Sequence, residues 1–144
     1  MARTSSTRRP ASSDWPKRGE IYVTALDSTV GHEINKTRPA LVIQNDTSNR
    51  YSAVTMVAPI TSMVRLPLSP LHVLLPADSS TGLMAASAAV FNQVRAVDRT
   101  RLVKKLGEVS SVVLAQVDEA IKTAFGLPSL ESDIDAPSDT GILG

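Results

Sequence analysis

The chain is divided into short apolar segments, and their length limits it to small β-sheet folds. Such segments occupy residues 19–27, 38–43, 53–60, 71–76 and 88–97. They contain many β-branched or aromatic residues and are separated by Gly, Pro, Asn and Ser, which favour turns. Short strands joined by turns predict a mostly β fold, either a small antiparallel barrel or a sandwich.

One segment near the end has the period of a helix instead. Its apolar residues recur every three or four positions and form one stripe: Val113, Leu114, Val117, Ala120, Ile121, Ala124 and Phe125. Ser110 or Ser111 is suited to cap its start, and Gly126 followed by Pro128 predicts its end. We therefore expect an α-helix that covers the barrel, which makes the fold α+β.

The chain is long enough for one hydrophobic core, since 42% of its 144 residues are apolar. Basic residues crowd the first part and acidic residues the last, and both ends are poor in large apolar residues. We predict flexible tails at residues 1–16 and 128–144 and one folded domain over residues 17–127. No segment approaches the roughly 20 apolar residues that span a bilayer, and no signal peptide is visible. A cytoplasmic protein without a membrane partner is expected.

The amino-acid content argues against several kinds of chemistry. The chain has no cysteine and two histidines, which excludes thiolate nucleophiles and leaves too few ligands for a typical zinc site. We expect neither a metal nor a cofactor. His32 lies in a polar loop and His72 in an apolar strand, where a surface or packed histidine is the usual outcome. Neither is assigned a role.

Arg38 directly precedes Pro39 at the start of an apolar run. Proline is expected at the first position of such a strand, and it forces the residue before it into an extended conformation. Arg38 is therefore held at a strand start, either as a structural clamp or as a reader of anions. Other polar residues lie at predicted strand ends or within a strand: Glu33, Thr61, Ser62, Gln93 and Arg95. Taken singly, each of these is more simply an ordinary surface residue.

Six segments occur in the order and approximate spacing of the MazF/PemK family of toxin endoribonucleases. They read RGEIY, DSTVGHE, TRPALVIQND, VAPIT, NQVRAVD and LGEVS. The resemblance covers residues 17–127 and implies a compact SH3-like barrel with a C-terminal helix. It also implies a homodimeric toxin that cuts single-stranded RNA at short sequences without a metal, together with a cognate MazE-like antitoxin.

The resemblance assigns catalytic roles to three residues. The catalytic arginine of the family corresponds to Arg38, its threonine or serine to Thr61, and its loop glutamate to Glu33. RNA supplies its own nucleophile, the 2′-hydroxyl, which DNA lacks. A fixed guanidinium suits the charge that develops on the phosphoryl oxygens. Because arginine stays protonated, Glu33 is the better candidate base, with Thr61 donating to the phosphate.

RNA binding is assigned by the same resemblance to residues beside the catalytic group. Ser62 follows the family threonine, and Gln93 corresponds to the polar residue of the NQVRAVD segment, which also contains Arg95. His32 stands where a small residue is common before the loop glutamate. This difference bears on the conformation of the loop and on base preference.

Two other functions compete with RNA cleavage. A CcdB-like toxin of the same barrel type binds DNA gyrase without catalysis, but such proteins depend on a tryptophan near the C-terminus, and the only tryptophan here is Trp15. A plain RNA-binding module would need aromatic residues for base stacking. The chain offers one Trp, two Tyr and two Phe, several of which we expect to be buried.

Overall fold

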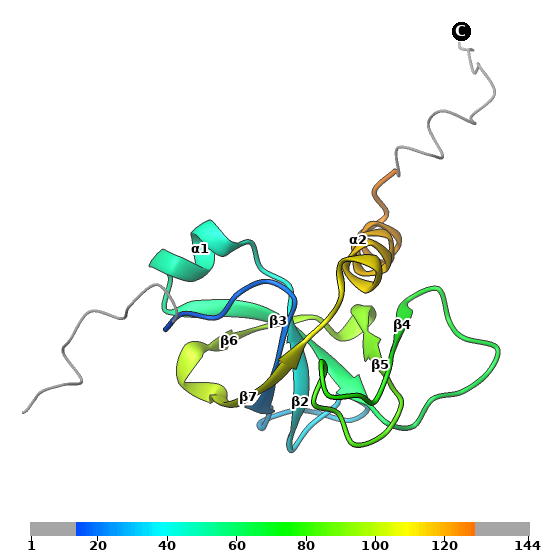
Figure 1. Ribbon diagram of the computed structural model, residues 1–144, viewed down its shortest axis with the longest axis horizontal. Helices are drawn as coiled ribbons and strands as arrows, with labels where there is room; N and C mark the ends of the chain where they lie inside the picture. Colours follow the sequence, from blue (N-terminus) through cyan, green and yellow to red (C-terminus); the bar gives the residue numbers. More distant parts are fainter. Residues whose placement is uncertain (1–13, 129–144) are drawn as a thin grey trace, which may run out of the picture.

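The computed structural model describes residues 14–128 (Figure 1), and its strands follow most of the predicted segments. The strands are β1 (Glu20–Ala25), β2 (Thr37–Val42), β3 (Val54–Thr61), β4 (His72–Leu75), β5 (Ser87–Val90), β6 (Arg95–Asp98) and β7 (Leu102–Glu108). The helices are α1 (Asp46–Tyr51) and α2 (Ser111–Phe125), and two 3-10 turns are η2 (Phe91–Gln93) and η3 (Arg99–Arg101).

The strands form one antiparallel sheet in the order β4-β5-β3-β2-β1-β7, and β6 also pairs with β3. The long strand β3 changes partner along its length: its first half pairs with β6 and its last two residues pair with β5. Because no pairing within residues 14–128 joins β6 to β7, the sheet curls without closing. The predicted mostly β, SH3-like fold with a C-terminal helix is confirmed, although the barrel is open.

Helix α2 begins and ends where the sequence predicted. The Ser110 hydroxyl accepts the N–H of Val113 at 3.2 Å, and Gly126 closes the helix in the left-handed conformation with φ of 73°. Val117 and Ala120 are buried against the sheet. Phe125, which was expected in the buried stripe, is 62% exposed at the last position of the helix.

Alternate residues of the central strands pack into two hydrophobic clusters on opposite faces of the sheet. The helix-side cluster contains Ile21, Leu41, Ile43, Ala58, Ile60, Val73, Leu75, Leu83, Ala89, Phe91, Val117 and Ala120. The loop-side cluster contains Leu26, Ala40, Val42, Val57 and Val97, with Tyr22, Ile34 and Leu102 packed against it. The sheet is therefore buried on both faces, which explains the nearly continuous apolar run of β2.

Three elements differ from the prediction. Residues 88–97, expected to contain one strand, form β5, the turn η2 and β6. Strand β7 was missed because lysines interrupt its apolar pattern and most of its side chains are exposed or half-buried. Helix α1 lies where a turn was expected, since Asn45 caps a helix by accepting the N–H of Ser48 at 2.8 Å.

Pro39 is the third residue of β2, not the first as predicted. It lies opposite Val23 of β1, whereas the pairing of β2 with β3 begins one residue later, at Ala40. The missing N–H thus falls where β2 has a single neighbouring strand. Arg38 consequently lies inside the strand and keeps its extended backbone.

The folded unit begins earlier than predicted. Trp15 and Pro16, assigned above to the N-terminal tail, are buried. The guanidinium of Arg50 and the Nζ of Lys17 lie 5.1 Å and 5.7 Å from the centre of the Trp15 ring. The rest of that predicted tail, and the C-terminal one after Pro128, lie outside the described residues.

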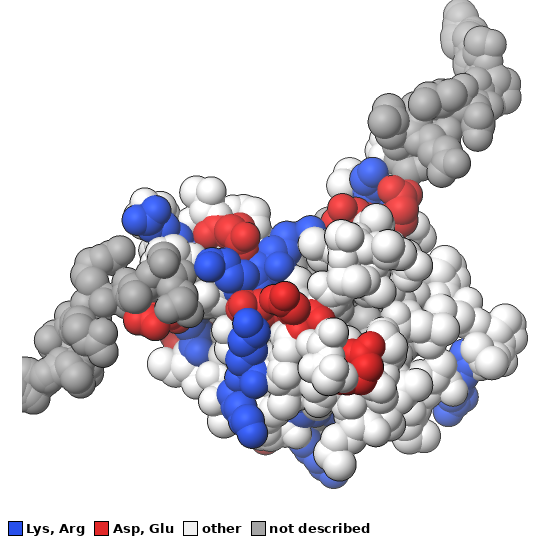
Figure 2. All heavy atoms as spheres, viewed as in Figure 1, with Lys and Arg blue, Asp and Glu red and all other residues white. Residues whose placement is uncertain are grey.

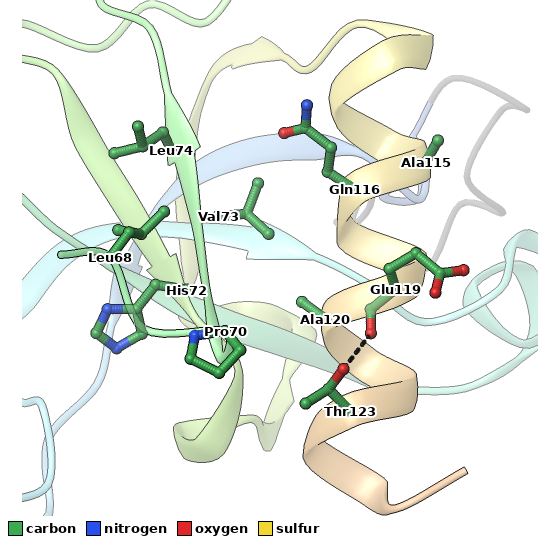
Figure 3. Close-up of a pocket in the computed structure, with 10 residues that line it drawn as sticks. All are labelled: Leu68, Pro70, His72, Val73, Leu74, Ala115, Gln116, Glu119, Ala120 and Thr123. Carbon is green, nitrogen blue, oxygen red and sulfur yellow. Dashed lines mark hydrogen bonds between the residues drawn. The ribbon is translucent and has the colours of Figure 1, made fainter. Parts of the chain in front are cut away.

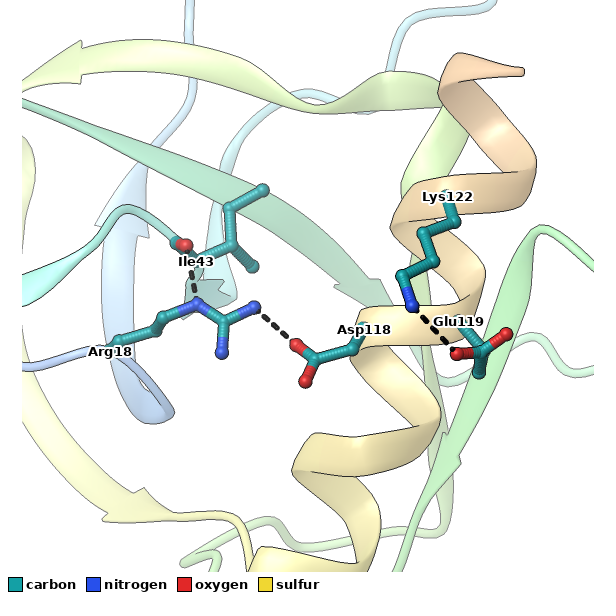
Figure 4. A network of polar contacts seen from close by, with 5 residues as sticks. All are labelled: Arg18, Ile43, Asp118, Glu119 and Lys122. Carbon is teal, nitrogen blue, oxygen red and sulfur yellow. Dashed lines mark hydrogen bonds and ion pairs between the residues drawn. The ribbon is translucent and has the colours of Figure 1, made fainter. Parts of the chain in front are cut away.

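Arg18 joins three elements near α2 (Figure 4). Its Nε donates to the carbonyl of Ile43 at 2.8 Å, and its Nη2 pairs with Asp118 of α2 at 2.7 Å. Its backbone N–H donates to Asp46, the first residue of α1, at 2.6 Å. Arg18 therefore ties both helices to the end of β2.

Candidate active site

The connection between β1 and β2, residues 26–36, is closed at its base by two hydrogen bonds, and we call it the site loop. Leu26 N–H donates to the carbonyl of Lys36 at 3.1 Å, and Lys36 N–H donates to Asp27 Oδ1 at 3.0 Å. At its tip, the carboxylate of Glu33 accepts the N–H of Val30 at 2.8 Å. The candidate base Glu33 is thus exposed but held in a turn.

Strands β2 and β3 bring Arg38 and Thr61 to the same part of the sheet. The pairing of these strands ends with Ala40 opposite Pro59, so Arg38 on β2 and Thr61 on β3 each lie two residues beyond the last pair. Arg38 is half-buried, and its Nε donates to the carbonyl of Asn35 at 2.8 Å. A site-loop carbonyl therefore orients the candidate catalytic guanidinium.

Two pockets adjoin this part of the sheet. Arg38 and Ser62 line a largely apolar pocket of about 500 Å³, whose walls come mainly from β1–β3 and from the connection between β4 and β5. Glu33, Gln93 and Arg95 line another pocket of about 320 Å³. Arg38 and the candidate base Glu33 thus line different cavities, which share no residue, and Thr61 lines neither.

The sequence suggested that Gln93 and Arg95 lie in one strand, but the structure places them in different elements. Gln93 lies in η2 and Arg95 is the first residue of β6. Gln93 Oε1 accepts the N–H of Ile34 at 2.6 Å, and Arg95 Nη1 donates to the carbonyl of Leu26 at 2.7 Å. Both side chains hold the backbone of the site loop.

Arg101 also contacts the site loop, and the sequence predicted no role for it. Its Nη1 donates to the carbonyl of Ala25 at 2.9 Å and also to the carbonyl of Asp27, at the start of the site loop. The signal was present in the sequence, because the basic segment DRTR directly follows NQVRAV. It was hidden because Arg101 reaches the loop only through the pairing of β7 with β1.

Three arginines, Arg38, Arg95 and Arg101, donate to backbone carbonyls in or next to the site loop. Within residues 14–128, ion pairs involve Arg18, Lys105 and Lys122, and Figure 2 shows basic and acidic side chains intermixed on one face. Arg38 and Arg95 are in none of these ion pairs. A carbonyl orients a guanidinium but does not neutralise its charge, so these two arginines suit a polyanion.

The two histidines lie in different parts of the fold. His32 is exposed in the site loop, and His72 lines an apolar pocket of about 520 Å³ between β4 and α2 (Figure 3). None of the predicted site residues lines that pocket. In residues 14–128 there is no group of three or more metal-binding side chains, and no helix there is long and apolar enough to cross a bilayer.

Comparison with known proteins gives one consistent result. The family model described as PemK-like, MazF-like toxin of type II toxin–antitoxin system matches residues 17–125. Endoribonuclease MazF9 of Mycobacterium tuberculosis is 40% identical over 116 residues, covering 77% of this chain and 97% of the relative. Endoribonuclease EndoA of Bacillus subtilis is 36% identical over 111 residues, covering 77% of this chain and 95% of the relative.

Solved structures give the same result. MazF of Deinococcus radiodurans superposes with a TM-score of 0.66 at 27% identity, covering 78% of this chain and 98% of that one. A MazE–MazF structure from the same organism superposes with a TM-score of 0.60 at 28% identity, covering 78% and 97%. Each match spans nearly the whole length of the relative.

Proposed function

The chain belongs to the PemK-like, MazF-like toxins of type II toxin–antitoxin systems, and from this we propose that it is an endoribonuclease that cuts single-stranded RNA. The observation that carries the proposal is the half-buried side chain of Arg38, whose guanidinium is oriented by the carbonyl of Asn35. Its charge is therefore available to a phosphate.

In the proposed reaction the 2′-oxygen of the substrate attacks the adjacent phosphorus. The new O2′–P bond forms as the P–O5′ bond breaks, which leaves a cyclic 2′,3′-phosphate and a 5′-hydroxyl. The carboxylate of Glu33 takes the proton of the 2′-hydroxyl, and a solvent proton reaches the leaving oxygen. Arg38 and the hydroxyl of Thr61 stabilise the charge on the phosphoryl oxygens.

Substrate binding is proposed to extend over both pockets. Ser62 lines the pocket of Arg38, while Gln93 and Arg95 line the pocket of Glu33. A strand of RNA that passes between the pockets would contact both groups of residues. The positive charge of Arg38, Arg95 and Arg101 supports its binding.

The proposal includes a homodimer in the cytoplasm, inhibited by a cognate MazE-like antitoxin. A relative of Deinococcus radiodurans has been solved as MazE–MazF, which supports the antitoxin. The gyrase-binding alternative is not favoured, because the curated relatives are named endoribonucleases. No metal or cofactor is included, since the mechanism uses only side chains and the 2′-hydroxyl.

The experiment that tests the proposal uses one RNA in two forms. The purified protein is incubated with a long RNA in EDTA, and the new 5′ ends are mapped to find the cleavage sequence. A short substrate with that sequence is then made with a single 2′-deoxy sugar at the cut position. We expect the all-ribose substrate to be cut and the modified one to resist. Normal cleavage of the 2′-deoxy substrate would show that water is the nucleophile.

A further inference from the structure

The site loop is held at two points by one short segment of the chain. Gln93 and Arg95, separated by a single residue, reach Ile34 N–H and the carbonyl of Leu26, with hydrogen bonds of 2.6 Å and 2.7 Å. These contacts link residues 59 and 69 positions apart in sequence. The loop conformation therefore depends on a tertiary contact and not only on its own turns.

The contact to Ile34 lies two peptides before the carbonyl that orients the candidate catalytic arginine. Ile34 packs its side chain against the loop-side cluster, and its N–H is bound by Gln93. The carbonyl of Asn35 accepts the Nε–H of Arg38 at 2.8 Å. The N–H of the same peptide, that of Lys36, donates to Asp27 Oδ1 at 3.0 Å. Gln93 and Asp27 therefore hold the backbone on the two sides of Asn35.

We infer that Gln93 is a positioning residue, which acts on Arg38 through the backbone of Ile34 and Asn35. The inference rests on the proposed function, in which Arg38 stabilises the phosphoryl oxygens. A guanidinium stabilises a developing charge only in a fixed orientation, and small displacements of catalytic groups cost much of the rate. Loss of the Gln93 contact therefore lowers turnover more than it weakens RNA binding.

A positioning role and a direct RNA contact would use different atoms of the Gln93 side chain. Positioning uses the side-chain oxygen, which accepts the N–H of Ile34. A contact to a phosphate would use the amide N–H₂ group, because a phosphate oxygen accepts hydrogen bonds. Glutamate keeps the oxygen and lacks the donors, whereas leucine lacks both.

The test compares wild type, Gln93→Glu and Gln93→Leu by two measurements. Amide hydrogen exchange reports on Ile34 N–H, and the NMR signal of the Arg38 Nε–H reports on its orientation. Cleavage of a substrate with one site, at a salt concentration that screens the added charge, gives kcat and KM separately. Gln116→Leu, the same change at an exposed residue of α2, is the matched control.

For Gln93→Leu we expect Ile34 to exchange about tenfold faster, because one hydrogen bond is lost. We also expect a shifted Arg38 Nε–H signal, and kcat lower by about tenfold with KM nearly unchanged. Gln93→Glu should restore the Ile34 protection and most of kcat. Gln93→Met, another unbranched chain without the acceptor, replaces Gln93→Leu if the latter does not fold.

Two results would overturn the inference. One is an Ile34 exchange rate in Gln93→Leu equal to that of wild type, whatever the activity. The other is a Gln93→Glu protein with normal Ile34 protection and the low kcat of Gln93→Leu, which would assign Gln93 to RNA contact. If wild type cuts no RNA, the proposed function fails, while the exchange and NMR measurements still test the contact.

Discussion

The two faces of the sheet are stabilised in different ways. On the helix side, twelve buried residues form a cluster that α2 completes. On the loop side, five buried residues form a smaller cluster, and side chains such as Gln93 and Arg95 hold the site loop by hydrogen bonds to its backbone. One face therefore supplies most of the apolar burial, and the other positions polar groups, so changes on each should affect different measurements.

The largest effect is expected on the loop side, from Arg38→Lys. A lysine keeps the charge but cannot reproduce the planar fork that faces a phosphate. Loss of a donor to a developing oxyanion costs about 3 kcal/mol, so kcat should fall about a hundredfold or more. The midpoint of urea unfolding should stay within error of wild type, since Arg38 is only half-buried.

The same change at Arg50, an exposed residue of α1, is the control for Arg38→Lys and should leave turnover unchanged. A folded Arg38→Lys protein with turnover near that of wild type would remove Arg38 from the catalytic group. The conclusion that the loop side governs activity and the helix side governs stability would then lose its main support.

On the helix side, Val117→Ala should have the opposite signature. Val117 is fully buried in the centre of α2. Removing two methyl groups from a packed position costs the transfer energy of those groups plus a cavity term, about 2 kcal/mol together. Urea unfolding should show this loss, while kcat and KM at 25 °C remain those of wild type. A fall in kcat at temperatures where the variant is fully folded would show that the faces are coupled.

A smaller effect on the same side is expected from Ser110→Ala. The hydroxyl of Ser110 accepts the N–H of Val113 at the start of α2, and loss of such a cap costs about 1 kcal/mol. Thermal unfolding should detect it. Ser111→Ala is the matched control, because Ser111 is the first helical residue and not the cap. Equal loss in the two variants would contradict the assignment of the cap.

The two faces also differed in how well the sequence predicted them. The helix side could be predicted because the period of α2 and its cap residues are local signals in the sequence. On the loop side, only resemblance assigned roles to Arg38 and Thr61, which lie two residues beyond the last pair of β2 with β3. The bonds from Gln93 and Arg101 to the site loop could not be predicted, because they join segments far apart in sequence through strand pairing.

The smallest effect at neutral pH is expected from Tyr22→Phe, which tests whether every polar group on the loop side serves the site. Tyr22 packs against the loop-side cluster, and its hydroxyl donates to Glu20 at 3.0 Å. Burial, and then the hydrogen bond to Glu20, raise the pKa of Tyr22 from 10.0 to about 12. Because the folded pKa is the higher one, the stabilisation is complete below pH 10 and is lost between pH 10 and about 12.

Wild type should therefore lose stability more steeply than Tyr22→Phe over that alkaline range. The pKa of Lys105 is also raised, by its hydrogen bond to Glu20, and its ion pair weakens in the same direction. Since Lys105 is present in both proteins, the difference between their urea midpoints isolates Tyr22. We expect that difference to favour wild type at pH 8 and to shrink as the pH rises, with kcat unchanged throughout. If the urea midpoints of the two proteins fall in parallel with pH, Tyr22 ionises equally in the folded and unfolded states. A changed kcat would extend the catalytic group to β1.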